Sequence, residues 1–198
     1  DDYDGSVTGA SRSALLELTI ALRSHRDSLV LIGGWVPYFL VQEHGPRDRD
    51  FKHVGSIDID LAVDPDRVDE ASYAEIVELI ARRGYVPRRT RTGQIIEFSY
   101  EKEVRSPTDG RSHTIWVDFL TERGAYPKRK RHRWVQPGLR ARMTEGCELA
   151  FSHNFTRTVK GPLPDNGVTE QPIRMLDIPG CIGMKGIVLG EGFREKDA

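Results

Sequence analysis

Hydrophobic residues along the first 120 positions recur with two different spacings, which predict both helices and strands. Leu15, Leu18 and Leu22 lie at helical spacing, which indicates an amphipathic helix. Ser11 or Ser13 can cap its start. Helices are predicted at residues 11–24, 34–43 and 69–83, and strands at residues 28–32, 57–63, 85–89, 94–100 and 114–120. This order predicts an α/β (α+β) fold in which a small mixed sheet is flanked by helices.

The pattern changes after Thr121, where the chain becomes basic and irregular as far as residue 142. Beyond this segment, strands are predicted at residues 148–151, 155–159 and 171–176, and a helix at residues 178–189. The helix is predicted in spite of three glycines, each of which costs about 1 kcal/mol relative to alanine. The chain is therefore predicted to have two parts, a core at residues 1–122 and a β-rich, then helical extension at residues 123–198.

Three aspartates on predicted strands are the main candidate site residues. Asp58 and Asp60 are one residue apart on a strand, so their side chains point to the same face. Asp118 lies in another apolar run and supplies a third carboxylate. Neighbouring carboxylates repel one another unless a cation lies between them, and a Mg²⁺ cage of this kind suits phosphoryl or nucleotidyl transfer. The alternatives are a surface Asp-x-Asp and a buried Asp118 that pairs with an arginine.

A glycine pair, Gly33-Gly34, stands between a predicted strand and a predicted helix. Glycines in this position either form a tight turn or let phosphate oxygens approach backbone N–H groups at the helix N-terminus, and the two roles are compatible. Ser56 precedes the aspartate pair. It is either a turn residue or a ligand of the β- or γ-phosphate of a nucleotide.

The succession of Gly33-Gly34, Ser56-x-Asp58-x-Asp60 and a later single Asp resembles the nucleotidyltransferase superfamily that includes DNA polymerase beta. Within it, the chain is most similar to the AbiEii-like toxin nucleotidyltransferases and their aminoglycoside-adenylating relatives. The resemblance covers roughly residues 10–120 and 172–198 and implies a polymerase-beta-like core at residues 1–122. The polar connection at residues 42–54 is longer than the family usually has between its glycines and its Asp-x-Asp.

The end of the chain adds a second part to the resemblance. Lys185, followed by Arg194-Glu195-Lys196-Asp197, resembles the Lys…Arg-x-Lys-Asp motif of the AbiEii-like branch. The family continues with more helix after this motif, so the C-terminal segment is expected to be incomplete. A lysine in an apolar segment can also be a surface residue that extends its amine into solvent.

The resemblance implies an enzyme that transfers an NMP from an NTP to an acceptor hydroxyl with two Mg²⁺ ions. Asp58 and Asp60 would bridge the metals, and Asp118 would hold the metal nearer the attacking hydroxyl. The implied catalytic residues are Asp58, Asp60, Asp118 and Lys185; the implied nucleotide-binding residues are Gly33, Gly34, Ser56, Lys185, Arg194 and Asp197.

The net charge of −1 conceals a strongly basic segment between Arg123 and Arg142. Basic blocks bind phosphate backbones, although a solvated loop is the ordinary alternative. Within this segment, Lys128, Arg129, Lys130 and Arg131 are candidate acceptor-binding residues. We therefore expect an RNA acceptor such as the tRNA 3′ end, and the resemblance implies a toxin with an antitoxin partner or a phage-defence protein. An antibiotic adenylyltransferase and a catalytically silent nucleotide-binding regulatory module are the alternatives.

The composition further restricts the class of protein to which the chain can belong. The chain has 198 residues with 38% hydrophobic and 30% charged residues, which is typical of a folded globular protein. No apolar run reaches the roughly 20 residues of a membrane helix, and two distant cysteines favour the cytoplasm. The sequence contains neither a Gly-x-Ser-x-Gly elbow nor a phosphate-binding P-loop motif, and its histidines lack zinc-ligand spacing.

Overall fold

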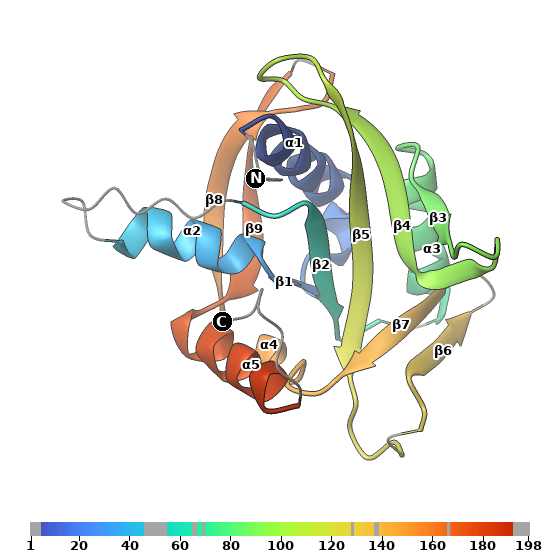
Figure 1. Ribbon diagram of the computed structural model, residues 1–198. Coiled ribbons are helices and arrows are strands. Elements are labelled where there is room, and N and C mark those ends of the chain that lie inside the picture. The colour runs from blue at the N-terminus through green and yellow to red at the C-terminus, as the bar shows by residue number, and fades with distance from the viewer. Residues whose placement is uncertain are drawn as a thin grey trace.

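The computed structural model describes residues 5–45, 55–64, 67–68, 70–127, 129–136, 139–165 and 167–191. Within these ranges the strands form one mixed sheet with helices packed against it (Figure 1). The strands are β1 (Leu29–Ile32), β2 (Asp58–Val63), β3 (Val86–Arg89), β4 (Ile95–Arg105), β5 (Ser112–Glu122), β6 (His132–Gln136), β7 (Leu139–Thr144), β8 (Asn154–Pro162) and β9 (Val168–Leu176). The helices are α1 (Gly5–Ala21), α2 (Trp35–His44), α3 (Glu70–Ala81), α4 (Leu149–Ser152) and α5 (Ile178–Glu191), with a 3₁₀ turn at Arg23–His25. The mixed α/β class predicted from the sequence is confirmed.

The main sheet has the strand order β3-β4-β5-β2-β1-β9-β8. Its centre combines antiparallel and parallel pairs: β1 runs antiparallel to β2, whereas β2 is parallel to β5 and β1 is parallel to β9. The remaining neighbours on this path are antiparallel hairpin partners. Strand β7 pairs with β6 and runs parallel to the last residues of β5.

Helices cover the two faces of the sheet unequally. Leu31 and Leu61 face α1 and line a cavity with Leu15 and Leu18 of that helix. Helix α1 contacts β4, β5, β8 and β9, so it lies across the curved sheet, and α3 packs beside it (Figure 1). On the other face, α2, α4 and α5 gather over β1 and β9. Because side chains alternate along a strand, Asp60, next to Leu61, points to this second face.

Helices α1 and α4 differ from the sequence prediction. Helix α1 begins at Gly5 rather than at residue 11, so neither Ser11 nor Ser13 is a cap; both are buried within the helix. Contacts with residues distant in sequence stabilise the additional N-terminal turns of α1. The Ser6 hydroxyl donates to Asp109 Oδ1 at 2.6 Å and lies 2.7 Å from His113 Nε2. Residues 148–151, predicted as a strand, belong to the turn and short helix α4.

The basic segment that the sequence suggested to be irregular contains β6 and β7. In β7, Leu139, Ala141 and Met143 are buried, while the residues between them are basic. Strands β7 and β9 join the sheet that holds β1, β2 and β5, so both predicted parts of the chain contribute to one sheet. The division at residue 122 stays a prediction.

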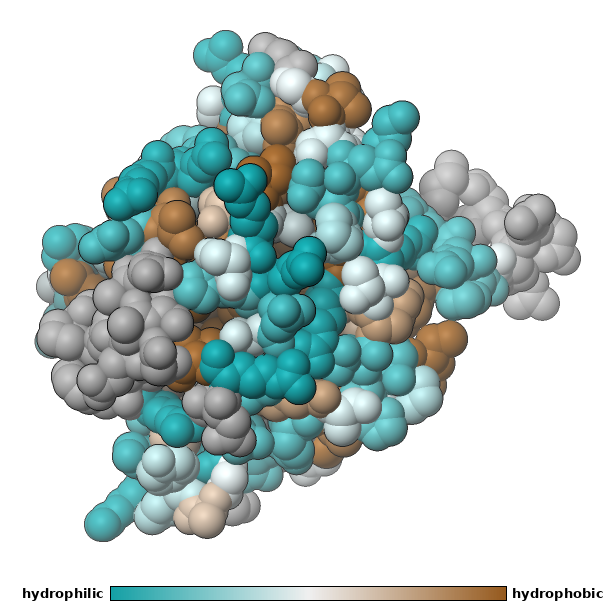
Figure 2. All heavy atoms as spheres, turned by 180° about the vertical axis from the view of Figure 1, so that it is seen from behind, coloured by the Kyte–Doolittle hydropathy of each residue, from teal (hydrophilic) through white to brown (hydrophobic). Residues whose placement is uncertain are grey.

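The face of the molecule opposite to Figure 1 is largely hydrophilic, and its hydrophobic residues lie in small separated groups (Figure 2). Among the helices in the described ranges, none is both long enough and apolar enough to cross a membrane.

Candidate active site

The register of β2 and β5 brings the three predicted aspartates to one face of the sheet. Asp60 is the direct partner of Asp118, and Asp58 is the partner of Trp116, in a parallel pair of strands. Residues directly opposite each other in neighbouring strands project from the same face. The shared face therefore follows from the strand alternation that the sequence predicts.

Asp118 is held by neighbours from two other strands. The Ser99 hydroxyl on β4 donates to Asp118 Oδ1, and Arg88 Nη1 on β3 lies 3.9 Å from the same oxygen. Burial raises the pKa of the Asp118 carboxyl above its ordinary value, and the charge of Asp58 acts in the same direction. The Ser99 hydrogen bond and the charges of Arg88 and Arg142 oppose this rise in pKa.

Asp118 also marks the point where β5 changes neighbours. Its pairing with Ser99 is the last between β4 and β5, and from Leu120 onward β5 pairs with β7. Where the neighbours of a strand diverge, the side chains at that point are accessible from the face of the sheet that carries them. In other sheets, binding sites also lie at changes of strand order. The Asp118 side chain is 20% exposed, so it is mostly but not completely enclosed.

The glycine pair touches the aspartate strand directly. Gly33 has φ +71°, which is the left-handed region, and a Cβ atom added there would overlap Asp60 Oδ2. A Cβ atom on Gly34 would lie 2.7 Å from Ser56 Oγ. Glycine is required here because β1 and the start of α2 approach the carboxylate strand too closely for any side chain.

Ser56 is buried and faces Asp58, since its hydroxyl donates to Asp58 Oδ1 at 3.1 Å. Behind the turn, the buried Trp35 indole donates to Ser11 Oγ at 3.2 Å, and Ser11 Oγ donates to the Ile57 carbonyl at 3.3 Å. This chain of hydrogen bonds connects α1, α2 and the strand that carries the aspartates. These contacts were not predicted, because Ser11 was interpreted, with Ser13, as a candidate helix cap.

Carboxylate oxygens are the donors that Mg²⁺ prefers, so the chemistry of the three aspartates fits this ion. In the described part of the chain, however, no three His, Cys, Asp or Glu side chains are close enough together to hold a metal. The side chains thus share a face without forming a finished cage, and Mg²⁺ binding stays a prediction.

Lys185 lies half-buried on α5, which packs against α2 and α4. Its charge opposes the rise in the pKa of the Cys181 thiol that burial produces. Asp60 is near the start of α4 as well, because its charge is among those that raise the pKa of the buried Cys147 thiol. Helix α4 contacts both α5, which carries Lys185, and β1, the strand beside that of Asp60. The predicted site residues Arg194 and Asp197 lie outside the described residues.

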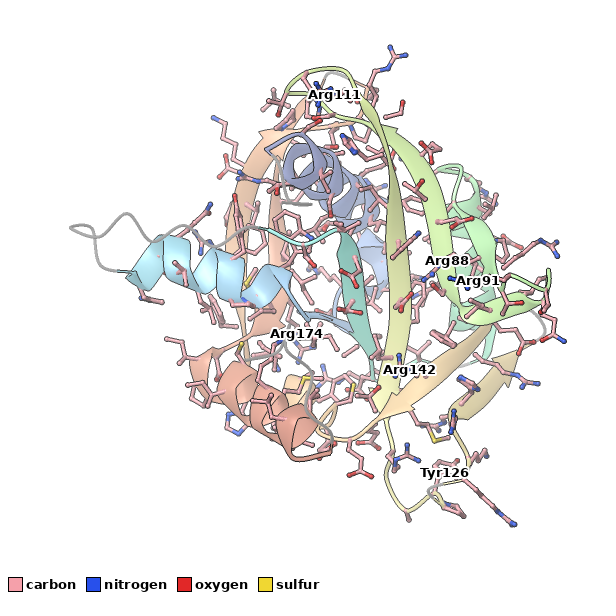
Figure 3. All side chains as sticks on the ribbon, in the orientation of Figure 1. Arg88, Arg91, Arg111, Tyr126, Arg142 and Arg174 are labelled. Atoms are coloured by element: carbon pink, nitrogen blue, oxygen red, sulfur yellow. The ribbon has the colours of Figure 1, made fainter. Side chains whose placement is uncertain are left out.

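The predicted acceptor-binding block lies beyond the end of β5. Lys130 packs over the ring of Tyr126 at 4.2 Å, and Arg129 and Arg131 are exposed; Lys128 lies outside the described residues. Figure 3 places Tyr126 at the bottom of the molecule and Arg142 above it, beside the last residues of β5, where it pairs with Leu120. The positive charges that lower the pKa of Asp118 include those of Arg88 and Arg142, which do not belong to the block.

A half-open pocket elsewhere in the molecule carries none of the candidate chemistry. It lies on the α1 face and is lined mainly by leucines, with Arg26 and Arg174 at its edge. Comparison of the chain with protein-family models, with curated proteins and with solved structures finds no match. The case for a function therefore depends on the residues and their arrangement.

Proposed function

We propose that this chain is a nucleotidyltransferase with a polymerase-beta-like core, which transfers an NMP from an NTP to an acceptor hydroxyl. One observation carries the proposal: Gly33-Gly34, Ser56, Asp58, Asp60 and Asp118, which are far apart in sequence, meet on one face of the sheet. A purely structural turn explains the glycines, but it does not explain the carboxylates of Asp58, Asp60 and Asp118 on the same face.

Each residue has a distinct task in this proposal. Asp58, Asp60 and Asp118 would hold Mg²⁺, which supplies charge neutralisation for the triphosphate and the leaving pyrophosphate. Asp118 would also accept the proton of the attacking hydroxyl. The backbone N–H groups of Gly33-Gly34, at the start of α2, would donate to phosphate oxygens.

We further propose an RNA acceptor, such as the tRNA 3′ end, and a role as the toxin of a toxin–antitoxin or phage-defence pair. The support is the resemblance to the AbiEii-like branch together with Arg88 and Arg142 beside Asp118. Positive charge next to the attacking group favours an anionic acceptor over a cationic antibiotic.

The test is to incubate the protein with each labelled NTP, Mg²⁺ and total RNA, and separately with protein extract or an aminoglycoside. We expect label in RNA and a loss of at least about 100-fold in rate for Asp58→Asn, because an amide does not hold Mg²⁺ as a carboxylate does. Asp165→Asn, an exposed aspartate on the β8–β9 loop, is the matched control and should retain full activity.

Three results would contradict parts of the proposal. Label in the aminoglycoside would assign the chain to the antibiotic adenylyltransferases. Nucleotide binding without transfer to any acceptor would favour the silent regulatory module. Unchanged transfer by Asp58→Asn would exclude the carboxylate mechanism.

A further inference from the structure

Arg88 on β3 contacts residues of both β4 and β5 around Asp118. Its Nη1 atom donates to Ser99 Oγ at 3.0 Å and lies 3.9 Å from Asp118 Oδ1. Its Nε atom is 3.9 Å from Glu101 Oε2. The guanidinium remains about one quarter exposed, so it can also meet a ligand that approaches the open face.

The same guanidinium lies over the indole of Trp116, 4.2 Å from the ring centroid. Trp116 is 36% exposed, although it is a large aromatic residue in the middle of β5. It is the direct partner of Asp58 across the sheet and lies two positions before Asp118, about 7 Å along the strand. An exposed aromatic ring and an arginine thus border the carboxylates on one side.

Exposed aromatic rings that adjoin an arginine are typical of sites for unpaired nucleotides. A nucleobase stacks on the ring whatever its sequence, and the guanidinium binds the phosphate. Arginine suits this task because its planar fork both stacks on aromatic rings and donates two parallel hydrogen bonds to phosphate oxygens. The distance from Trp116 to Asp118 is comparable with the size of one nucleotide.

We propose that Arg88 and Trp116 form a subsite for the terminal nucleotide of a single-stranded RNA acceptor. Trp116 stacks on the base, and Arg88 binds the adjacent phosphate, which places the terminal hydroxyl at Asp118. This subsite rests on the proposed nucleotidyl transfer and adds to it the residues that recognise the acceptor. The basic block at Arg129–Arg131 lies beyond the end of β5, where it contacts a part of the RNA that is farther from the terminal nucleotide.

Acidic residues near the subsite raise the question of a cationic ligand instead. Glu97 is paired with Arg140 at 2.8 Å, and Glu101 has Arg88 within 3.9 Å. These two carboxylates are therefore largely neutralised by arginines, so they offer little attraction to a basic peptide. A basic peptide is therefore a useful competing probe for this subsite.

The experiment measures binding of a short fluorescently labelled single-stranded RNA by anisotropy, without NTP or Mg²⁺, at several salt concentrations. Trp116→Ala should raise the Kd about 5- to 100-fold and leave the salt slope unchanged, since stacking carries no charge. Arg88→Gln should raise the Kd and also reduce the slope of log K against log salt by about 0.7, the contribution of one phosphate in a single strand.

Matched controls separate the subsite from general effects. Arg111→Gln removes an exposed arginine at the top of the molecule, away from Arg88, as Figure 3 shows, and should leave the Kd and the salt slope unchanged. Trp116→Phe should retain most of the affinity, because it keeps an aromatic ring, and Arg88→Lys should retain the salt slope, because it keeps the charge. If Trp116→Ala does not fold, the tryptophan emission of the wild type decides instead: RNA should quench it, and the quenching should diminish in Trp116→Phe.

Unchanged RNA affinity in both Trp116→Ala and Arg88→Gln would overturn the subsite, as would tighter binding of a Lys- and Arg-rich peptide that Glu101→Gln abolishes. These outcomes are distinct from failure of the proposed function. That failure is an absence of NMP transfer in the labelled-NTP assay, and RNA binding through Arg88 and Trp116 can persist without it.

Discussion

Gly33 is the residue where backbone conformation and site geometry constrain the chain together. Its φ of +71° disfavours any side chain, and a Cβ atom would also overlap the Asp60 carboxylate. We expect Gly33→Ala to destabilise the protein by about 2–4 kcal/mol, because both penalties apply at once. Chemical denaturation monitored by far-ultraviolet circular dichroism measures this change.

Gly93 provides the matched control for Gly33. It has φ +84° in the β3–β4 turn, but an added Cβ atom would meet nothing within 4 Å. Gly93→Ala should therefore cost only about 1 kcal/mol, the penalty of a left-handed alanine. Equal losses for the two variants would show that the approach of Gly33 to Asp60 carries no energetic weight.

Asp118 gives a prediction with opposite signs in the presence and absence of metal. Its folded-state pKa is raised, chiefly by burial, so the folded protein loses stability as pH rises from about 3.9, the ordinary value for aspartate, through the raised pKa. In the presence of EDTA, Asp118→Asn should therefore be more stable than the wild type at pH 7. The difference should vanish as pH falls below about 4.

Mg²⁺ should reverse this order of stability. A metal that binds the folded state stabilises it, and the wild type binds Mg²⁺ through a charge that the variant lacks. Thermal unfolding with and without Mg²⁺ at pH 7 tests the reversal. A wild type that gains no stability from millimolar Mg²⁺ would contradict a metal site at Asp118.

At the residue scale, the sequence predicted what depends on local spacing. The alternation of Asp58 and Asp60 and the glycine pair were visible because strand period and backbone freedom are local properties. Arg88 and Ser99 were not identified as site residues, because their proximity to Asp118 depends on the pairing of β3, β4 and β5.

At the scale of elements, a partly buried ion pair joins α1 to β4. Lys102 Nζ contacts Glu17 Oε2 at 2.7 Å, and both side chains are more than four-fifths buried. The lysine also lies 5.3 Å from the Tyr85 ring. A double-mutant cycle with Glu17→Gln and Lys102→Met should give a coupling energy of about 1–3 kcal/mol, since either single change leaves a buried charge without its partner.

The exposed pair Glu78–Arg82 on α3 is the comparison for this cycle. Its closest atoms are 3.4 Å apart, but both side chains are more than 60% exposed. Its coupling energy should be near the limit of measurement, because solvent screens exposed pairs. A coupling energy for Glu17–Lys102 no larger than that of Glu78–Arg82 would mean that α1 is held to β4 by apolar packing alone.

Secondary structure was predictable where hydrophobic period and length agreed. Strands β1, β2 and β5 were found within two residues of their ends. The alternation in β7 was also present, but its arginines were interpreted as part of a basic block rather than as the exposed side of a strand. The first turns of α1 contain two glycines and depend on contacts with distant loops, which a local pattern does not contain.

At the scale of the molecule, β1 joins the beginning of the chain to its end. It pairs with β2 on one side and with β9 on the other, and α1 also contacts β8 and β9. We expect residues 1–122 expressed alone to lack a cooperative unfolding transition, because the fragment would leave one side of β1 and part of α1 uncovered. Calorimetry of the fragment and of the whole chain tests this.

A cooperative transition in the isolated fragment would instead support the division at residue 122 that the sequence predicts. Its transition enthalpy, compared with that of the whole chain, would then show how much of the sheet the fragment forms by itself.

The parallel pairing of β1 with β9 also has a consequence during synthesis. A ribosome that adds about 5–20 residues per second needs roughly 7 to 29 seconds to proceed from Ile32, the last residue of β1, to Leu176, the last residue of β9. During that interval the nascent chain presents an open strand edge and the apolar side of its first helix to the cell. Early folding of this protein therefore depends on whatever shields those surfaces until the last strand emerges.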